Sequence, residues 1–466
     1  MIDPLRIRSL NDAPVRPDRE WVLYWMVSSR RIGFNPALER AAAHARALKR
    51  PLLVLDAVEC DYPWANARFH ACAIGSLWDL AARFQSAGIA HYPYVEPEPG
   101  AARGLLAALA AQACVVVTDD SPAFFFPRSR AAAARRLDVA LEAVDGVGLL
   151  PVRAAPRGFL RAVDFRRHLA SALPTHLGRF PLADSLSEPL PRAPSLPAAV
   201  TARWPLARPG DPLPAVVDRS VAPVAWKPGE TAAIRDLRSF VARLDDYTED
   251  RRHPDREGTS RLSPALHWGH LSVHAIWAEI ADRCGVDVVA GWEGLPEPHR
   301  NFLDELVTWR ELTHNTAAFL PNYDAYDSLP WWALESLAKH AGDPRPYLYE
   351  VEDLETASTH DPVWNAAQRQ LVAEGRIHNY LRMVWGKKVL EWSPSPEEGF
   401  RTLLHLNNRY AIDGRDPNSV GGIAWVFGRY DRPWGPERPI FGLIRYMSSE
   451  ATVRKVKMKE YLRNHQ

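Results

Sequence analysis

The chain has 466 residues, of which 47% are hydrophobic, and a formal net charge of +1. A chain of this length is too long for one compact core, so we expect two soluble domains. The charge balance excludes a uniformly basic nucleic-acid binder, so any contact with DNA must come from a local patch of cations.

The cysteines are scattered along the chain without CxxC or metal-ligand spacing, at Cys60, Cys72, Cys114 and Cys284. The sequence therefore predicts no disulfide framework and no metal site. The N-terminus lacks the apolar core of a signal peptide, and no apolar run reaches the roughly 18 residues that a membrane helix needs. We therefore expect a cytoplasmic protein without membrane contact.

Short apolar runs alternate with Ala-rich helical patterns in the first third of the chain. The apolar runs predict buried parallel strands at 21–27, 51–58, 91–95 and 114–120. Helical patterns follow at about 35–49, 65–87 and 100–112. This alternation is typical of a doubly wound, Rossmann-like α/β sheet, which we place at 20–171. No GxGxxG or Walker motif follows any of these strands, which argues against the usual dinucleotide and P-loop sites.

Proline becomes frequent between 172 and 230, which disfavours long helices and predicts an interdomain linker. From 231 to 466 we expect an all-α domain, because the patterns are almost wholly helical. The predicted helices lie at 229–247, 272–284, 296–316, 331–340, 363–392 and 396–410. Most of the 17 tryptophans lie in this part. Tryptophan adds little to a core that leucine cannot supply, unless its ring faces a flat ligand or another ring.

Four segments of the C-terminal part stand out: GTSRLSPALHWGHLS (258–272), FLDELVTWREL (302–312), RIHNYLRMVWGKKVLEW (376–392) and LNNRYAIDGRDPN (406–418). The third predicts a helix on which Trp385 and Trp392 share one face, about 10 Å apart along the axis. Core packing is the simplest explanation of any single tryptophan. Taken together and in this order, the segments closely resemble the class II cyclobutane pyrimidine dimer DNA photolyases of the photolyase/cryptochrome family. The resemblance implies the same two-domain arrangement.

The segment 258–263 combines small residues, hydroxyl groups and a helix start, which suits a diphosphate, although a plain N-cap would use the same residue types. The resemblance implies FAD as the cofactor. The positions that match its contacts are Tyr247, Thr259, Ser260, Leu262, Ser263, Asn379, Arg382 and Asp413. Arg382 and Asp413 would flank the polar edges of the flavin ring, where a cation favours the anionic reduced form. A structural ion pair is the alternative. Asn379 stands where many class II members carry glycine.

The resemblance also assigns an electron route. Trp385 lies nearest the flavin in this assignment, Trp364 is the middle relay, and Trp392 is the outer donor near solvent. Asn407 falls where the family places an asparagine near the reactive ring nitrogen, and an amide can donate or accept there. A helix cap is the alternative for Asn407. Val384 stands where family members often have tyrosine.

A cyclobutane dimer must be flipped out of the duplex to reach the flavin, and poorly stacked, damaged bases flip most cheaply. The positions that match the family's lesion pocket are Trp309 and Trp425 as flat walls, Glu305 as the carboxyl group at the base edge, and Met383 as an apolar contact. Glu305 and Trp309 are four residues apart on one predicted helix, so their side chains point the same way. A surface glutamate and a core tryptophan are the alternative.

Three further residues match DNA contacts of the family: Arg261, Arg432 and Trp434. The chain is about one residue shorter than the family between Trp425 and Arg432, so we expect this loop to hold the opposite strand differently. The basic segment 453–463 has the composition of a phosphate contact, but a solvated helix has the same composition.

The sequence therefore predicts light-dependent DNA repair, in which excited, reduced FAD transfers an electron to a flipped cyclobutane pyrimidine dimer and splits it into two pyrimidines. The partner would be UV-damaged DNA and the protein a monomer. A cryptochrome-like photoreceptor that signals through protein partners is the alternative, and the lesion-pocket residues favour repair. An antenna chromophore, a deazaflavin or a folate, is common in the family. The segment TDDSPAFFFP (118–127) departs from the family's usual sequence and assigns neither.

Overall fold

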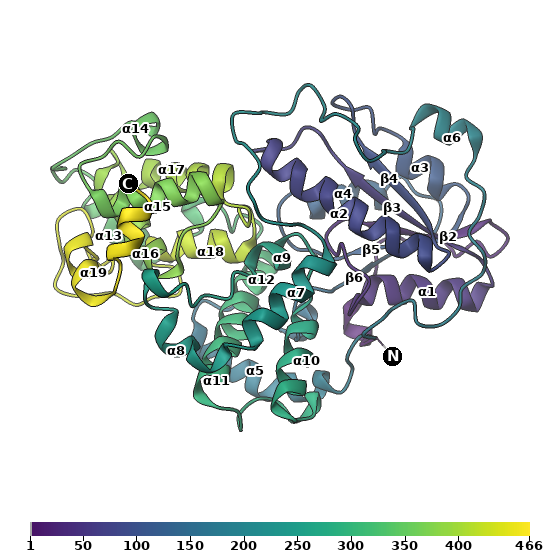
Figure 1. Cartoon of the computed structure of the whole chain (residues 1–466), viewed down its shortest axis with the longest axis horizontal. Coiled ribbons are helices and arrows are strands. Elements are labelled where there is room, and N and C mark those ends of the chain that lie inside the picture. Colours follow the sequence, from purple (N-terminus) through teal and green to yellow (C-terminus); the bar gives the residue numbers. More distant parts are fainter. Residues whose placement is uncertain (1) are drawn as a thin grey trace. The chain divides into compact units, whose positions relative to one another are not determined.

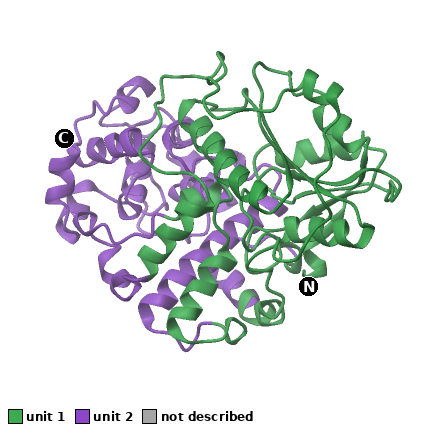
Figure 2. Ribbon diagram, turned by 45° about the vertical axis from the view of Figure 1, so that its right-hand side comes forward, with its two compact units in different colours: residues 1–156, 169–241, 262–291 green, residues 157–168, 242–261, 292–466 purple. Residues whose placement is uncertain are grey.

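The computed structural model describes residues 2–466, and Figure 1 shows its helices and strands. The chain forms two compact units, and each is assembled from separate stretches of sequence. Unit 1 comprises Met1–Pro156, Leu169–Val241 and Leu262–Gly291. Unit 2 comprises Arg157–His168, Ala242–Arg261 and Trp292–Gln466 (Figure 2).

Unit 1 contains a six-stranded sheet of order β1-β6-β5-β2-β3-β4. Its strands are β1 (Ile7–Ser9), β2 (Trp21–Met26), β3 (Leu52–Val58), β4 (Ala90–Val95), β5 (Ala113–Asp119) and β6 (Leu141–Val144). All neighbours are parallel except β1 and β6. The α/β prediction is confirmed, and the four predicted strands are β2 to β5. The short strands β1 and β6 were not predicted. Strand β1 (IRS) has no apolar run and lies at the edge of the sheet.

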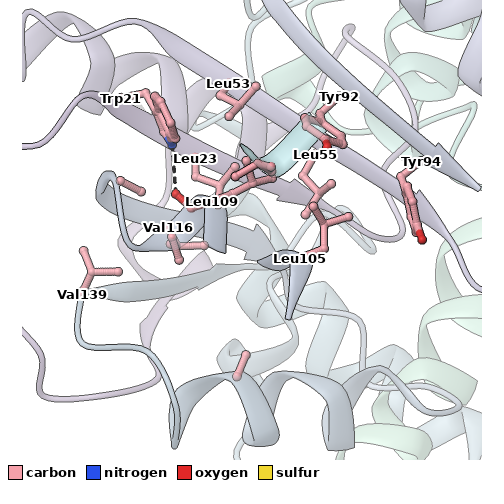
Figure 3. Packing of buried hydrophobic residues seen from close by; sticks show 14 of the residues in the cluster. Trp21, Leu23, Leu53, Leu55, Tyr92, Tyr94, Leu105, Leu109, Val116 and Val139 are labelled. Carbon is pink, nitrogen blue, oxygen red and sulfur yellow. Dashed lines mark hydrogen bonds between the residues drawn. The ribbon is translucent and has the colours of Figure 1, made fainter. Parts of the chain in front are cut away.

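The central strands are buried on both faces, which explains their continuous apolar sequences. Trp21 and Leu23 of β2 pack on one face with Leu53, Leu105 and Leu109 (Figure 3). The alternate residues of the same strand pack into a second cluster on the opposite face: Val22, Tyr24 and Met26. The Trp21 indole also donates a hydrogen bond to the Leu109 carbonyl at 3.2 Å.

The helices of unit 1 are α1 (Pro36–Leu48), α2 (Ala67–Ser86), α3 (Leu105–Ala110), α4 (Phe126–Ala134), α6 (Ala198–Arg203), α7 (Glu230–Val241), α9 (Ser263–His267) and α10 (Val273–Cys284); α5 (Ala162–Leu177) runs through the boundary between the units. Residues 172–230 contain the end of α5, the short α6 and extended chain. This Pro-rich stretch belongs to unit 1, where the buried Trp204 packs into the same cluster as Trp21.

The described part of unit 2 contains helices and no paired strands. They are α8 (Tyr247–Asp250), α11 (Glu297–Leu303), α12 (Arg310–Phe319), α13 (Trp331–Lys339), α14 (Val351–Glu355), α15 (Pro362–Glu374), α16 (Asn379–Trp392), α17 (Pro396–Tyr410), α18 (Pro417–Val426), α19 (Ser449–Lys455) and α20 (Lys459–Asn464). A π-helical turn, Asp304–Trp309, joins α11 to α12.

The prediction of one helix over 363–392 was wrong. The chain leaves the helical path at Gly375, whose φ of 71° ends α15, and His378 then caps the start of α16. Helix α18 was not predicted, because its sequence PNSVGGIAWV contains two glycines, which disfavour a helix in isolation. Helices α16, α17 and α18 pack on one another and carry seven of the 19 predicted site residues.

None of the helices formed by residues 2–466 is long and apolar enough to cross a membrane. Within the same residues, no group of three or more His, Cys, Asp or Glu side chains has a metal-binding arrangement.

Candidate functional site

The hydroxyl-rich loop before α9 packs closely on Asp250 and accepts hydrogen bonds from the Arg243 side chain. At Gly258, a Cβ atom would lie 2.4 Å from the Cβ of Asp250, so this close approach requires glycine. Arg243 donates hydrogen bonds to the carbonyls of Glu257 at 3.1 Å and Thr259 at 3.2 Å. These contacts fix the loop against the end of α8.

The plain N-cap explanation of this loop does not hold. Helix α9 begins at Ser263, and its capping residue is Leu262, which makes no side-chain capping hydrogen bond. Thr259 and Ser260 belong to unit 2, whereas Leu262 and Ser263 belong to unit 1. The diphosphate contact of these four residues stays a prediction.

Arg382, Asn407, Asp413 and Ser419, which we call the polar cluster, come together from α16, α17, α18 and the loop before α18. Arg382 donates to the Ser419 hydroxyl at 3.1 Å and to Asn407 Oδ1 at 3.4 Å. Ser419 in turn donates to Asn407 Oδ1 at 2.9 Å. Arg382 Nη2 lies 3.7 Å from Asp413 Oδ1. The predicted Arg382–Asp413 pair therefore forms, and Asn407 is part of the same network.

Sequence reasoning missed Ser419. The signal was available, because Asp416 caps α18 and Pro417 occupies its first position, a combination typical of a helix start. A helix placed there puts Ser419 in the first turn. Asn407 is not a cap either, since it lies inside α17 and its side-chain amide donates to Asn408 Oδ1 at 3.0 Å.

The polar cluster suits the edge of a flavin ring. Asp413 Oδ1 is buried and accepts no hydrogen bond from any of residues 2–466. A buried carboxylate oxygen without a donor is costly, so this atom is suited to a ligand that brings an N–H group. A flavin ring has an imide N–H between two carbonyl oxygens, which match a carboxylate and a guanidinium. The residues present therefore fit FAD.

Two further predicted flavin contacts differ in exposure. Tyr247 is buried and packs edge-to-face on Phe302 with 5.4 Å between the ring centroids. Burial, followed by the nearby Glu305 carboxylate, raises the pKa of Tyr247 to about 12, so the phenol stays neutral. Asn379 is exposed as the first residue of α16.

The three predicted relay tryptophans lie in a row in the predicted order. Trp385 and Trp364 are parallel, with 6.5 Å between the centroids and 7° between the planes. Trp364 and Trp392 are 5.7 Å apart at 66°. The Trp364 indole donates to the Trp385 carbonyl, and the Trp385 indole donates to Gln368 Oε1, each at 3.0 Å. Gln368 was not predicted, because its partner lies on a different helix.

The prediction that Trp392 lies near solvent was wrong. Its exposed fraction is 1%. Tyr349 and His360 each pack against it with centroids at 5.3 Å, and the half-exposed Tyr347 stacks on His360 at 3.7 Å. The cover comes from the segment around α14, which the spacing within α16 cannot reveal.

Trp309 and Trp425 are stacked on each other, with 4.5 Å between the centroids and 15° between the planes. Stacked indoles leave no room for a base between them, and the role of the two rings as flat walls of a lesion pocket stays a prediction. Trp309 ends the π-helical turn and Trp425 lies near the end of α18. Both side chains are partly exposed. Together they form one aromatic platform. Met383 is also partly exposed, on α16.

Glu305 and Trp309 are both partly exposed, while the three residues between them are buried. Both residues lie on the π-helical turn, and the expectation that their side chains point the same way stays a prediction. Glu305 accepts a hydrogen bond from Arg251 Nη1 at 2.5 Å. Arg251 was not predicted, although it lies four residues after Tyr247 and its guanidinium lies 5.3 Å from the centre of that ring.

The loop that follows α18 brings Arg432 and Trp434 together. Arg432 lies over the Trp434 ring at 4.4 Å, and Arg445 lies 5.0 Å from the same ring. The Trp434 indole donates to Asp431 Oδ1 at 2.9 Å. A guanidinium on an indole face makes a favourable cation–π contact, and its N–H groups can still bind a phosphate.

Arg261 is exposed and has a left-handed backbone, with φ of 57°. It forms an ion pair with Glu257, which also pairs with Arg376 at 3.2 Å. A contact between Arg261 and DNA therefore requires Glu257 to share or release this cation.

No protein-family model matches the chain. It is 35% identical to a deoxyribodipyrimidine photo-lyase of Methanothermobacter thermautotrophicus over 99% of this chain and 98% of the relative. A protein of the same name from Oryza sativa is 33% identical over 98% and 89%. Two solved structures share the fold at a TM-score of 0.69. A class III photolyase from Agrobacterium tumefaciens is 19% identical and is covered to 86%; a Synechocystis cryptochrome is 18% identical and is covered to 88%. Each match spans 96% of this chain. Since the sequence similarity extends over nearly the whole length of both chains, this protein belongs to the deoxyribodipyrimidine photo-lyase family.

Proposed function

We propose that this protein is a class II photolyase that binds FAD and repairs cyclobutane pyrimidine dimers in light. The observation that carries the proposal is the position of the tryptophan row. Trp385 follows Arg382 by three residues on α16, so the row of indoles begins one helical turn from the polar cluster. A chain of indoles that ends beside a flavin-binding cluster is what a photoreducible flavin requires. The four motif segments support the class II assignment.

FAD, when bound, supplies the absorption of light and the electron that opens the cyclobutane ring. The chain supplies the environment. Arg382 offers a cation at one polar edge of the ring site, Asp413 offers an acceptor for an N–H group, and Asn407 holds its amide oxygen against Arg382. The residues proposed for the rest of the cofactor are Tyr247, Thr259, Ser260, Leu262, Ser263 and Asn379.

The relay residues return electrons to the cofactor and do not face the lesion. The parallel rings of Trp385 and Trp364 give close contact for electron transfer, and the bond to Gln368 fixes the orientation of Trp385. Since Trp392 is covered, electrons from solution enter through the rings that pack on it.

Lesion binding is proposed for the platform of Trp309 and Trp425, because aromatic faces stack on flipped bases without regard to sequence. Glu305 would meet the edge of the dimer, and Met383 would pack against it. Arg261, Arg432 and Trp434 would contact the DNA around the lesion. Partial exposure of Glu305, Trp309 and Trp425 favours repair over a purely signalling role.

The test is anaerobic illumination of the purified protein with oligonucleotides that carry one defined lesion. We expect an FAD spectrum and light-dependent loss of the cyclobutane dimer, with a (6-4) photoproduct as the control substrate. A colourless protein that takes up no FAD would refute the proposal. FAD binding and photoreduction without repair of any dimer would favour the photoreceptor alternative.

A further inference from the structure

The basic segment near the C-terminus lies outside the site described above, and the structure shows that it is not one solvated helix. Helix α19 ends at Lys455, Val456 has an extended backbone, and α20 begins at Lys459. Two residues of this crossing are buried, Val456 and Met458. The exposed positions alternate with them: Lys455, Lys457 and Lys459. These three lysines, which we call the lysine strip, therefore lie on the outer side of the segment.

The lysine strip is fixed on the loop that follows α8. The Lys457 amide donates to His253 Nδ1 at 3.1 Å, and the Lys457 carbonyl accepts from the Asp255 amide at 3.2 Å. Asp255 Oδ1 accepts in turn from the Tyr461 amide at 2.8 Å. The buried Tyr461 hydroxyl donates to Gln370 Oε1 at 2.9 Å, which ties α20 to α15. The backbone of the strip is therefore already ordered, so a ligand does not have to order it on binding.

The lysine strip has no acid of its own. Within residues 2–466, no carboxylate forms an ion pair with any of its three lysines, and the acids around them have other partners. Glu460, which follows the strip, pairs with Arg463 at 3.5 Å. Asp250, near the start of the facing loop, pairs with Arg256 at 2.6 Å. Three cations that no acid neutralises, on a fixed backbone, attract a ligand that carries several negative charges.

The contacts of the lysine strip lead back to the proposed lesion site. His253, which holds Lys457, comes two residues after Arg251, and Arg251 donates to Glu305 at 2.5 Å. Arg252, between Arg251 and His253, is exposed and adds a further cation. Cations therefore continue from the residues beside Glu305 to the strip, although the two segments are about 200 positions apart in the sequence.

We propose that the lysine strip binds backbone phosphates of the duplex that flanks the lesion. A DNA duplex carries one negative charge per about 1.7 Å of its axis, so a row of lysines can neutralise several phosphates. Such contacts do not depend on base sequence or damage, so the strip adds affinity for every duplex and leaves recognition of the lesion to other residues. A protein with a net charge of only +1 needs a local patch of this kind. The inference rests on the proposed repair function and adds a surface to it.

The experiment measures Kd in the dark by fluorescence anisotropy over a range of salt concentrations. The DNA is a long duplex or a duplex cut back close to the lesion on both sides, each with and without a thymine dimer. The strip variant carries Lys455→Gln, Lys457→Gln and Lys459→Gln. The rescue variant, which keeps the charge, carries Lys455→Arg, Lys457→Arg and Lys459→Arg. The control variant removes three exposed cations from unit 1 and carries Arg135→Gln, Arg136→Gln and Lys227→Gln. FAD occupancy is measured for each variant to show that the fold is retained.

We expect the strip variant to bind the long duplex about tenfold more weakly at low salt, by the same factor with and without the dimer. The slope of log Kd against log salt should fall by about 0.9 for each phosphate contact that is lost. The rescue and control variants should keep the parental Kd and slope. On the short duplex the strip variant should bind like the parent, because the flanking phosphates are absent.

An FAD-loaded strip variant that keeps the parental Kd and slope on the long duplex would overturn the inference. An equal loss in the control variant would do the same, since net charge and not the strip would then be responsible. An equal loss on the short duplex would also contradict it. Failure of the repair function is distinguishable, because the parent would then show no preference for the dimer, whereas the undamaged long duplex still tests the strip.

Discussion

Trp385 gives the sharpest test of the relay at the level of single residues. Trp385→Phe removes the ring that stacks on Trp364 and that lies one helical turn from Arg382. We expect the variant to lose photoreduction of oxidised FAD yet to repair dimers normally after chemical reduction of the cofactor. Absorption spectra under blue light measure the first effect and a repair assay the second. Trp277→Phe, in a buried tryptophan of unit 1, is the control. Unchanged photoreduction in Trp385→Phe would show that electrons travel by another route.

Trp309 tests the aromatic platform. Trp309→Ala removes one ring of the stacked pair, and base–aromatic stacking contributes about 1–3 kcal/mol per base. We therefore expect dimer binding to weaken by a factor of about 5 to 150, while binding to undamaged duplex stays nearly constant. Trp331→Ala is the control, because Trp331 is 76% exposed and matches no predicted contact. Gel-shift titrations measure the affinity for both DNAs. If binding to damaged and undamaged DNA weakens equally while FAD is retained, Trp309 is a core-packing residue.

The residues that escaped sequence reasoning share one property. Arg251, Gln368 and Ser419 acquire their roles from partners on other elements, so neither periodicity nor spacing could identify them. Trp364 and Trp385, by contrast, were assigned through the family resemblance and lie in the predicted order. The burial of Trp392 could not be predicted, because its cover comes from residues about 30 to 45 positions away in the sequence.

At the scale of elements, the contact between α16 and α18 positions both the polar cluster and the platform. A Cβ atom at Gly386 of α16 would lie 2.4 Å from Val426 Cγ2 of α18. Gly386→Ala must therefore displace the Val426 side chain at the end of α18, the helix that carries Ser419 and Trp425. We expect a loss of about 1–3 kcal/mol in the free energy of unfolding, measured in urea. Gly422→Ala in α18 is the matched control, since nothing lies within 4 Å of a Cβ there. Equal stability of the two variants would contradict this packing.

Lys387, the next residue of α16, is buried and donates to the Val426 carbonyl at the end of α18. Burial lowers the pKa of Lys387 from 10.5 to about 7. Between these values the unfolded chain holds a proton that the folded chain does not, so this group makes stability rise as pH rises from about 7 toward 10.5. We expect Lys387→Met to reduce the gain in the free energy of unfolding between pH 7 and pH 9 that urea titrations measure in the parent. Lys388→Met, which removes a lysine paired with Glu391 at 2.9 Å, should retain that gain.

The elements also show where sequence patterns suffice. Strands β2, β3 and β5 were predicted because burial on both faces makes each of them a continuous apolar run. The edge strand β1 and the glycine-containing α18 depend on neighbours for their structure, and their own sequences do not show it. The break at Gly375 was missed because apolar residues continue at helical spacing through it.

At the scale of the whole molecule, the net charge is only +1, so local phosphate contacts set how DNA binding responds to salt. Phosphate contacts are shared by damaged and undamaged DNA, whereas stacking and base-edge hydrogen bonds belong to the lesion alone. We expect both Kd values to rise together between about 50 and about 200 mM salt, so that their ratio stays constant. Fluorescence anisotropy on matched duplexes measures this. A ratio that collapses with salt would show that charge, and not the aromatic platform, distinguishes the lesion.

Each unit is built from separate stretches of the sequence, so neither can complete its fold early in translation. A ribosome releases the N-terminus first, and a domain made of one continuous stretch can fold while synthesis proceeds. Unit 1 needs residues 262–291, and unit 2 needs residues 157–168 as well as the C-terminal stretch. A nascent chain that ends at residue 241 has α7 without α10, on which α7 packs. Its apolar surfaces therefore remain open to chaperones until translation has passed residue 291.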